Sequence, residues 1–177
     1  MTEPMKYGQT EFEVHLPPEL IAAELEPNQV DLPQRTTAEH IRWALDHPID
    51  SAPLKELVKA GDKVCVVISD VTRRWQAPDT YLPILIGELE AAGVRDEDIL
   101  ILSATGTHRR QTEEEHIGLV TKPVYDRIRV EDHVCTDQDN LAYVGTTSRG
   151  TPVWLDKRAL ACDKIILTGG VVYHFMA

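Results

Sequence analysis

The sequence predicts an α/β fold: a mostly parallel sheet with flanking helices, in a Rossmann-like arrangement. Short apolar runs rich in β-branched residues recur along the chain, which is typical of strands buried on both faces of a parallel sheet. Segments with apolar residues at helical spacing separate these runs, as crossover helices do. The chain has 177 residues, of which 42% are hydrophobic, and this is enough for one domain with its own core.

The first third of the chain predicts one strand and short helices. Polar and apolar residues alternate over Glu11–Leu16, which indicates a half-exposed strand. The acidic segment Glu19–Gln34 contains two prolines and predicts a short helix and a surface loop. A capping box at Thr36–Glu39 opens a helix that Pro48 closes, and a second short helix is expected over Leu54–Lys59.

The regular part of the fold begins with a buried strand over Lys63–Ile68. A helix is expected from Pro78 to Gly93, since proline favours the first helical position and glycine the C-terminal cap. Its apolar stripe consists of Leu82, Leu85, Ile86 and Leu89. The next strand is expected over Ile99–Leu102, and a second capping box at Thr112–Glu115 begins another helix.

The last third predicts strands. Ile128–Cys135 is expected to form one, and Leu141–Leu155 a hairpin that turns at Ser148–Gly150. Lys164–Leu167 is expected to be the last buried strand. With the preceding elements these complete a β-α-β-α-β order.

Charge and cysteine content exclude several classes of protein. There are 18 Lys and Arg against 29 Asp and Glu, a net charge of -11, which argues against binding a phosphate backbone or an anionic membrane. Three widely spaced cysteines without a CxxC pair argue against a disulfide framework or a zinc ribbon. The N-terminus lacks the apolar stretch of a signal peptide. We therefore expect a soluble cytoplasmic protein.

Polar clusters follow three of the predicted strands. They are Ser69–Arg74, Ser103–Arg110 and Thr168–His174. The carboxyl ends of parallel strands meet at one edge of a sheet, where open α/β sheets bind ligands. We therefore expect an acid, several arginines and two histidines to share one crevice.

Each cluster also has a purely structural interpretation. Asp70 can simply cap a turn and Arg73 can pair with it at the surface. Thr105–Thr107 can be a tight turn, or a cradle for an anion around Gly106. His174 lies among apolar neighbours and can be a core histidine, whereas His108 is followed by two arginines and calls for water or an anion. The remaining histidines are interpreted as structural or solvated: His15, His40, His47, His116 and His133.

Standard nucleotide and hydrolase motifs are missing. The sequence contains no GxGxxG, no GxxxxGK[ST], no HExxH and no GxSxG. What remains is an anion-attracting crevice with two imidazoles on separate loops. Such a pair can act as acid and base on either side of a substrate.

At these clusters the sequence resembles the lactate racemase family, whose members use a nickel-pincer nucleotide. The matching strings are SDVTR at Ser69–Arg73, ATGTH at Ala104–His108 with Arg109, and TGGVVYH at Thr168–His174. Three ordered motifs together are specific for the family, and the resemblance extends over nearly the whole chain.

The resemblance implies roles for these residues. His108 and His174 are the expected catalytic pair. The expected cofactor-binding residues are Asp70, Val71, Thr72 and Arg73, and Arg73 is also expected to bind the substrate carboxylate. The family reaction is a concealed hydride transfer from carbon 2 of a 2-hydroxy acid such as lactate. One histidine removes the hydroxyl proton and the other returns a proton to the product.

The resemblance also implies a longer protein. The family continues beyond the position of Ala177 with a lysine that tethers the cofactor, a histidine that binds nickel, and a second domain. Residues 1–177 are therefore expected to be the N-terminal catalytic and cofactor-binding domain of a two-domain enzyme, with no metal ligand of their own. Alone, they are expected to be inactive. Cofactor-biosynthesis proteins and a small 2-hydroxy acid are the expected partners.

Two other functions remain open. The first is a non-catalytic α/β module that binds a nucleotide or another anion, for which a second histidine is unnecessary. The second is a hydrolase with a His–Asp metal site, which needs a third ligand beside His108 and His174, supplied by Asp70.

Overall fold

The computed structural model describes residues 2–8, 10–26, 28, 30–31 and 33–172. The chain divides into two compact units, residues 1–34 and 35–177. The first unit is an antiparallel hairpin of β1 (Thr2–Tyr7) and β2 (Thr10–His15), followed by a 3₁₀ turn at Pro18–Leu20. The strand predicted around Glu11–Leu16 is confirmed, but five of the six β2 residues are exposed, so the expected half-burial is wrong. Strand β1 is an addition. The helix predicted after Glu19 is, among the described residues, only that turn.

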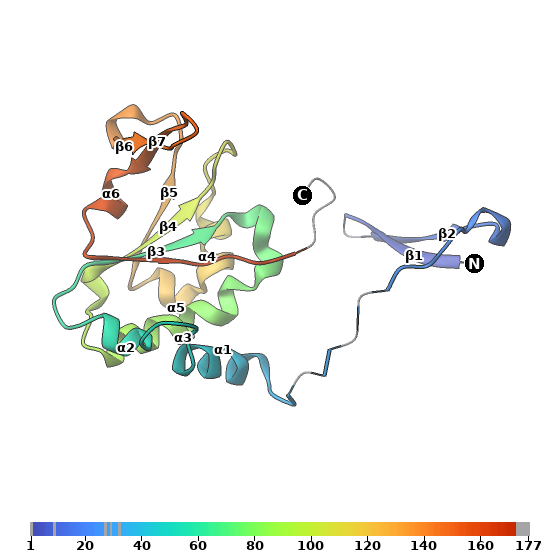
Figure 1. Cartoon of the computed structure of the whole chain (residues 1–177), viewed down its shortest axis with the longest axis horizontal. Coiled ribbons are helices and arrows are strands. Elements are labelled where there is room, and N and C mark those ends of the chain that lie inside the picture. Colours follow the sequence, from blue (N-terminus) through green and yellow to red (C-terminus); the bar gives the residue numbers. More distant parts are fainter. Residues whose placement is uncertain (1, 9, 27, 29, 32, 173–177) are drawn as a thin grey trace. The chain divides into compact units, whose positions relative to one another are not determined.

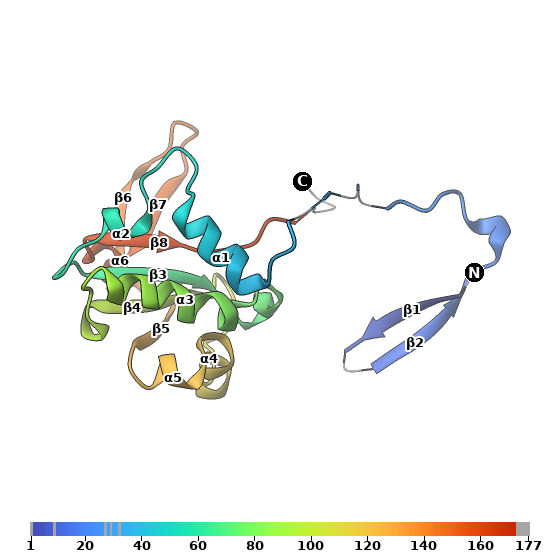
Figure 2. The ribbon, with the colours of Figure 1, turned by 90° about the horizontal axis from the view of Figure 1, so that it is seen from below.

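The second unit contains a four-stranded, fully parallel sheet, which confirms the predicted fold class. The strands lie in the order β5–β4–β3–β8, as Figures 1 and 2 show. Their bounds are Val64–Ser69 for β3, Ile99–Ala104 for β4, Arg129–His133 for β5 and Lys164–Leu167 for β8. The chain runs outward from β3 to β5 and then returns to the other side of β3. The strand order therefore reverses between β3 and β8, which is where open α/β sheets form ligand crevices.

Six α-helices are found among the described residues. They are α1 (Thr37–Asp46), α2 (Leu54–Leu57), α3 (Pro78–Ala91), α4 (Glu113–Val120), α5 (Lys122–Tyr125) and α6 (Lys157–Leu160). Both predicted capping boxes are present: Thr36 with Glu39 opens α1, and Thr112 with Glu115 opens α4. The short helix expected over Leu54–Lys59 is present as α2, whereas α5 and α6, which also have four residues each, were not expected.

The main core lies on one face of the sheet. Val64, Val66 and Ile68 of β3 are almost fully buried there, against the predicted apolar stripe of α3. All five helices α1 to α5 contribute side chains to this core or pack against it. Burial of these alternate residues fixes β3 at the centre of the domain. It thereby also fixes the backbone position of Asp70, which directly follows the strand.

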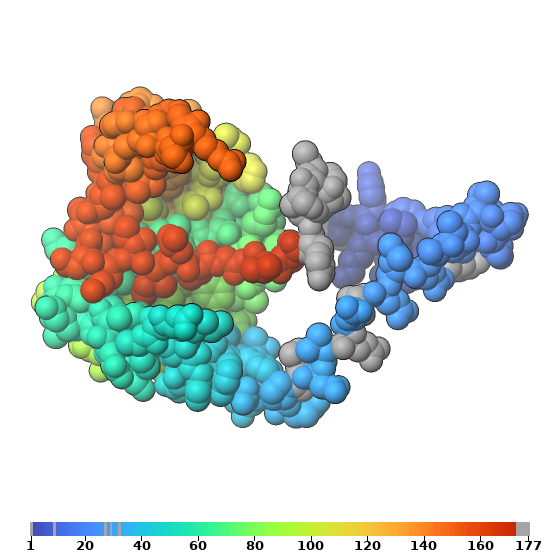
Figure 3. Space-filling view, in the orientation of Figure 1, coloured from blue at the N-terminus to red at the C-terminus, as the bar shows by residue number. Residues whose placement is uncertain are grey.

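The opposite face of the sheet is more thinly covered. Cys65 and two leucines of β4 pack there against Ala159 of α6. The prediction that β8 is a buried strand is wrong, since Ile165 is 44% and Leu167 is 76% exposed. The reason is that β8 is an edge strand, and the short helix α6 covers little of this face. In the space-filling view the β8 segment is visible along its length (Figure 3).

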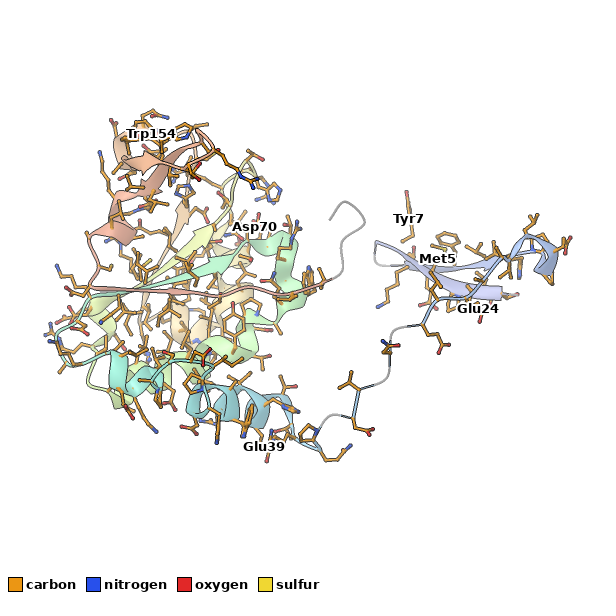
Figure 4. All side chains as sticks on the ribbon, in the orientation of Figure 1. Met5, Tyr7, Glu24, Glu39, Asp70 and Trp154 are labelled. Carbon is orange, nitrogen blue, oxygen red and sulfur yellow. The ribbon has the colours of Figure 1, made fainter. Side chains whose placement is uncertain are left out.

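The predicted hairpin is confirmed as β6 (Leu141–Thr146) and β7 (Pro152–Asp156). Figure 4 labels Trp154 on β7. Asp156 anchors this hairpin to the sheet. Its carboxylate accepts from Arg158 Nε at 2.9 Å and Nη2 at 2.6 Å, and lies 3.1 Å from His133 Nδ1 of β5. His133 therefore has the structural role that the sequence predicted.

This anchor predicts a pH-dependent stability. Burial alone would raise the pKa of Asp156, but the hydrogen bonds from Arg158 and His133 outweigh it and lower the pKa to about 2. A lowered carboxyl pKa contributes stability that is present above the unfolded-state value and is lost as pH falls from about 4 to about 2. Hydrogen bonds to charged groups contribute about 1.5–3 kcal/mol each, so we expect Asp156→Asn to lower the unfolding free energy by about 2 kcal/mol at neutral pH.

Urea unfolding at neutral pH and near pH 3 measures this effect. The difference between Asp156→Asn and the unsubstituted chain should shrink at the lower pH. Asp126→Asn is the control, because Asp126 pairs with Lys122 at the surface and is more than half exposed. It should change stability by less than about 1 kcal/mol. An equal loss at both pH values would contradict the assignment.

Among the residues that the structure describes, no helix combines the length and the apolar composition needed to cross a membrane.

Candidate active site

Asp70, labelled in Figure 4, is the first residue after β3. It is 4% exposed. Its Oδ1 accepts hydrogen bonds from the Thr72 backbone N–H at 3.2 Å and the Thr72 hydroxyl at 2.6 Å. Asp70 thereby caps the 3₁₀ segment Val71–Gln76. The turn-capping interpretation is confirmed, but it uses only one carboxylate oxygen.

The second oxygen of Asp70 contacts His108. The distance from Asp70 Oδ2 to His108 Nδ1 is 2.5 Å. The two residues are 38 positions apart in sequence, but β3 and β4 pair in parallel with Ser69 opposite Ala104. The loops after these strands therefore leave the sheet side by side, as the sequence predicted.

The His108 loop makes a tight turn immediately after β4. The backbone N–H of His108 donates to the carbonyl of Thr105 at 2.9 Å, and Gly106 adopts a φ of +59°. Only glycine adopts this left-handed conformation without steric cost, as expected for Gly106. The turn carries the imidazole back over the sheet edge, with 49% of the side chain exposed.

The electrostatics of this pair define the state of the imidazole. Burial raises the pKa of Asp70, but hydrogen bonds from Thr72 and His108 outweigh it and bring the pKa below its usual value. Asp70 is therefore a carboxylate at neutral pH and can only accept, so Nδ1 of His108 must carry a proton. In the neutral ring the lone pair then lies on Nε2, which is the nitrogen that can act as a base.

A hollow of about 330 Å³ lies beside this pair and is called the strand-end hollow here. It is lined by Ser69, Asp70, Thr72, Arg73 and Ala104–His108. Arg73 donates to the Thr72 hydroxyl at 3.2 Å and does not form the surface pair with Asp70 that the structural interpretation required. An exposed guanidinium next to an imidazole is suited to an anionic group such as a carboxylate.

The structure brings most of the predicted site residues together. Asp70, Thr72, Arg73 and His108 all line the strand-end hollow. Val71 instead packs against the main core and lines an adjacent hollow of about 250 Å³. His174 lies outside the described residues, so its place in the site stays a prediction.

The third predicted cluster begins at the same sheet edge. The Thr168 hydroxyl donates to the carbonyl of Val67 at 2.9 Å, next to the end of β3. Gly170 lies so close to Trp75 that an added Cβ would stand 2.9 Å from the indole ring. The chain after β8 thus passes close to the Val71–Gln76 segment, and a larger residue at position 170 would require the exposed Trp75 ring to shift.

Three polar residues near the site were not among the predicted site residues, although His116 was interpreted as structural or solvated. Gln111, Asp132 and His116 form a hydrogen-bonded group beneath the His108 loop. Asp132 lies near the carboxyl end of β5. An acidic residue at the end of a fourth predicted strand is the feature of the sequence that could have indicated this group. Within the described part of the chain, no three His, Cys, Asp or Glu side chains are arranged to hold a metal ion. The ligand set of the metal-hydrolase interpretation includes His174, which lies outside the described residues, so these residues do not test that interpretation.

The described geometry agrees with the result of comparison with known protein families. A family model described as the lactate racemase N-terminal domain matches residues 7–177. The chain belongs to the lactate racemase family. The resemblance seen in the three strand-end motifs is thereby confirmed.

Curated lactate racemases are similar over most of the chain. The protein of Lactiplantibacillus plantarum is 31% identical over 140 residues, which cover 78% of this chain and 32% of that protein. The protein of Thermoanaerobacterium thermosaccharolyticum is 26% identical over 172 residues, covering 97% of this chain and 40% of that protein. The chain therefore spans about a third to two-fifths of the length of these lactate racemases.

Solved structures also match this chain. The lactate racemase apoprotein from Thermoanaerobacterium thermosaccharolyticum matches with a TM-score of 0.75 at 26% identity, over 94% of this chain and 38% of that one. A Thermotoga maritima protein matches with a TM-score of 0.58 at 24% identity, over 74% of this chain and 33% of that one, and supports the fold alone. The lactate racemase fold is thus shared over nearly all of the chain.

Proposed function

We propose that this chain provides the N-terminal acid–base domain of a two-domain racemase or epimerase that interconverts the enantiomers of a 2-hydroxy acid such as lactate. The observation that carries the proposal is the Asp70–His108 pair, at 2.5 Å, beside the Arg73 guanidinium in the strand-end hollow. Family membership supports the reaction class.

In this proposal Arg73 binds the substrate carboxylate and His108 acts on the substrate hydroxyl. The Nε2 lone pair of His108 accepts the hydroxyl proton, and the Asp70 carboxylate stabilises the imidazolium that forms. Asp70 is therefore assigned a positioning role in addition to the predicted contact with the cofactor. His174 is proposed as the second acid–base group, on the other side of the substrate.

The polar wall of the hollow fits part of a nucleotide cofactor. The Arg73 guanidinium offers N–H donors there, and the Thr72 hydroxyl, whose hydrogen is donated to Asp70, keeps one lone pair as an acceptor. Both carboxylate oxygens of Asp70 already have partners within the chain. When bound, the nickel-pincer nucleotide would supply the acceptor for the hydride on carbon 2 of the substrate. We propose that the tethering lysine and the nickel-binding histidine lie in the part of the protein outside these 177 residues.

A hydride route suits neutral histidines. Removing a proton from the carbon next to a carboxylate demands a base far stronger than imidazole, whereas removing a hydroxyl proton as hydride leaves carbon 2 does not. The chain's own task is thus to hold the carboxylate and to move a hydroxyl proton. We further propose a cytoplasmic location, in keeping with three cysteines that form no disulfide, and dependence on cofactor-biosynthesis proteins.

The proposal predicts the fate of an isotopic label. The full-length protein, produced together with the cofactor-biosynthesis proteins, should convert each enantiomer of [2-²H]lactate into the other with deuterium retained at carbon 2. Retention follows because a transferred hydride does not exchange with water. Chiral chromatography with mass spectrometry measures both quantities.

Other results would reject the proposal. Loss of the label to solvent would contradict the hydride route. Binding of a nucleotide without interconversion of any 2-hydroxy acid in a panel would instead favour the non-catalytic binding module.

A further inference from the structure

Gln111 connects the ends of three strands with one side chain. Its Oε1 accepts from the Val71 backbone N–H at 2.7 Å, in the loop after β3. Its Nε2 donates to Ser103 Oγ of β4 and to Asp132 Oδ1 of β5, both at 2.8 Å. Its own backbone N–H donates to Asp132 Oδ2 at 2.8 Å. Every hydrogen-bonding atom of this amide is therefore in use.

Chemistry fixes the orientation of the amide. A backbone N–H can only donate, so the atom facing Val71 must be the carbonyl oxygen. A carboxylate can only accept, so the atom facing Asp132 must be the nitrogen. A side chain of the same shape but different donors cannot make both contacts.

Asp132 provides a rigid anchor for this amide. It is 7% exposed and pairs with Ser103 in the register of β4 and β5. Burial raises its pKa, but hydrogen bonds from Gln111 and His116 outweigh this effect and bring the pKa below its usual value. The anchor is thus a buried carboxylate that is already oriented by the sheet.

Gln111 acts on both members of the Asp70–His108 pair. Val71, whose backbone N–H donates to the Gln111 side chain, directly follows Asp70. Gln111 itself lies three residues after His108. The His108 loop is fixed at its other end by Thr105, whose buried hydroxyl donates to the carbonyl of His133. The five residues between these two fixed points, 106–110, are all exposed. Arg109 makes an exposed ion pair with Glu115, and beyond it Gln111 is the first residue after His108 that ties the loop to the sheet.

We propose that Gln111 is a positioning residue that keeps the His108 imidazole aligned on Asp70, with its proton on Nδ1. This role rests on the proposed function for its effect on catalysis, but the alignment itself is a property of the chain alone. The two consequences can therefore be measured separately.

The alignment is measured by ¹⁵N NMR of the neutral imidazole in this chain. The unsubstituted chain should show one tautomer, with the proton on Nδ1 of His108. Gln111→Met keeps the length of the side chain but removes all its hydrogen bonds, and should give a mixture of both tautomers. In the full-length enzyme, kcat should fall about 10-fold while KM changes less than about twofold.

Two controls separate positioning from general damage. Gln138→Met makes the same chemical change at an exposed residue and should alter neither readout. Val124→Ala opens the core below α5, and it should lower the melting temperature while the single tautomer persists.

A paired substitution tests the donor pattern. Gln111→Glu sets two carboxylates against each other and should behave like Gln111→Met or worse. Adding Asp132→Asn restores a donor opposite Glu and should recover the single tautomer. A single Nδ1–H tautomer in Gln111→Met, or no recovery in the folded double variant, would overturn the proposal. An inactive full-length protein with the expected tautomers would reject only the proposed function.

Discussion

Replacing His108 by Ala in the full-length enzyme is expected to slow the interconversion of the two enantiomers about 10²–10⁴-fold in both directions. In the proposed mechanism each turnover removes one proton and returns one, so the loss of either imidazole would interrupt both the forward and the reverse reaction. The side chain is 49% exposed, so folding should be little affected. Initial rates from each pure enantiomer measure the effect.

The matched control for this substitution is His47→Ala. His47 is also exposed, and its ring stacks on Trp43 at the end of α1 with centroids 4.7 Å apart. Its removal should leave both rates within about twofold, as for surface substitutions away from a site. A His108→Ala enzyme with rates close to those of His47→Ala would return His108 to a structural role.

Asp70→Asn is expected to lower kcat about 10²-fold, although the two side chains have nearly the same shape. The Thr72 backbone N–H at 3.2 Å can only donate, so the amide oxygen of Asn must take the place of Oδ1. The amide nitrogen then faces His108 Nδ1 and donates to it. The ring proton is forced onto Nε2, and the base at that position is lost.

This prediction has a spectroscopic signature as well as a kinetic one. The ¹⁵N spectrum of the Asp70→Asn chain should show the Nε2–H tautomer of His108, the opposite of the unsubstituted chain. Asp126→Asn, a surface change from carboxylate to amide, should leave the tautomer unchanged. An Nδ1–H ring in Asp70→Asn would show that Asp70 does not set the protonation of His108.

Local signals in the sequence predicted much of the fold. The capping boxes at Thr36 and Thr112 and the stripe on α3 depend on contacts within four residues, and all three are present. The exposure of β8 could not be predicted this way. An apolar run such as Lys164–Leu167 is compatible with a central strand and with an edge strand. Which of the two positions β8 takes depends on the path of the whole chain.

The site was predictable where it follows from sheet topology. The convergence of Asp70, Thr72, Arg73 and His108 follows from two neighbouring parallel strands. The Gln111–Asp132 contact does not, because it joins residues 21 positions apart and depends on the pairing of β4 with β5. That pairing brings a fourth strand end beside the other three, and no local pattern indicates which strands are neighbours.

The position of β3 in the sheet has a consequence for the order of assembly during translation. One neighbour of β3 is β4, but the other is β8, and the Lys63–Asp163 bond at the start of that contact joins residues 100 positions apart. A ribosome that adds about 5–20 residues per second needs roughly 5–20 s to cover this interval. During that time one edge of β3 lacks its partner while β4 can already pair with the other. The Asp70–His108 contact can therefore form on the nascent chain seconds before the loop after β8 is synthesised.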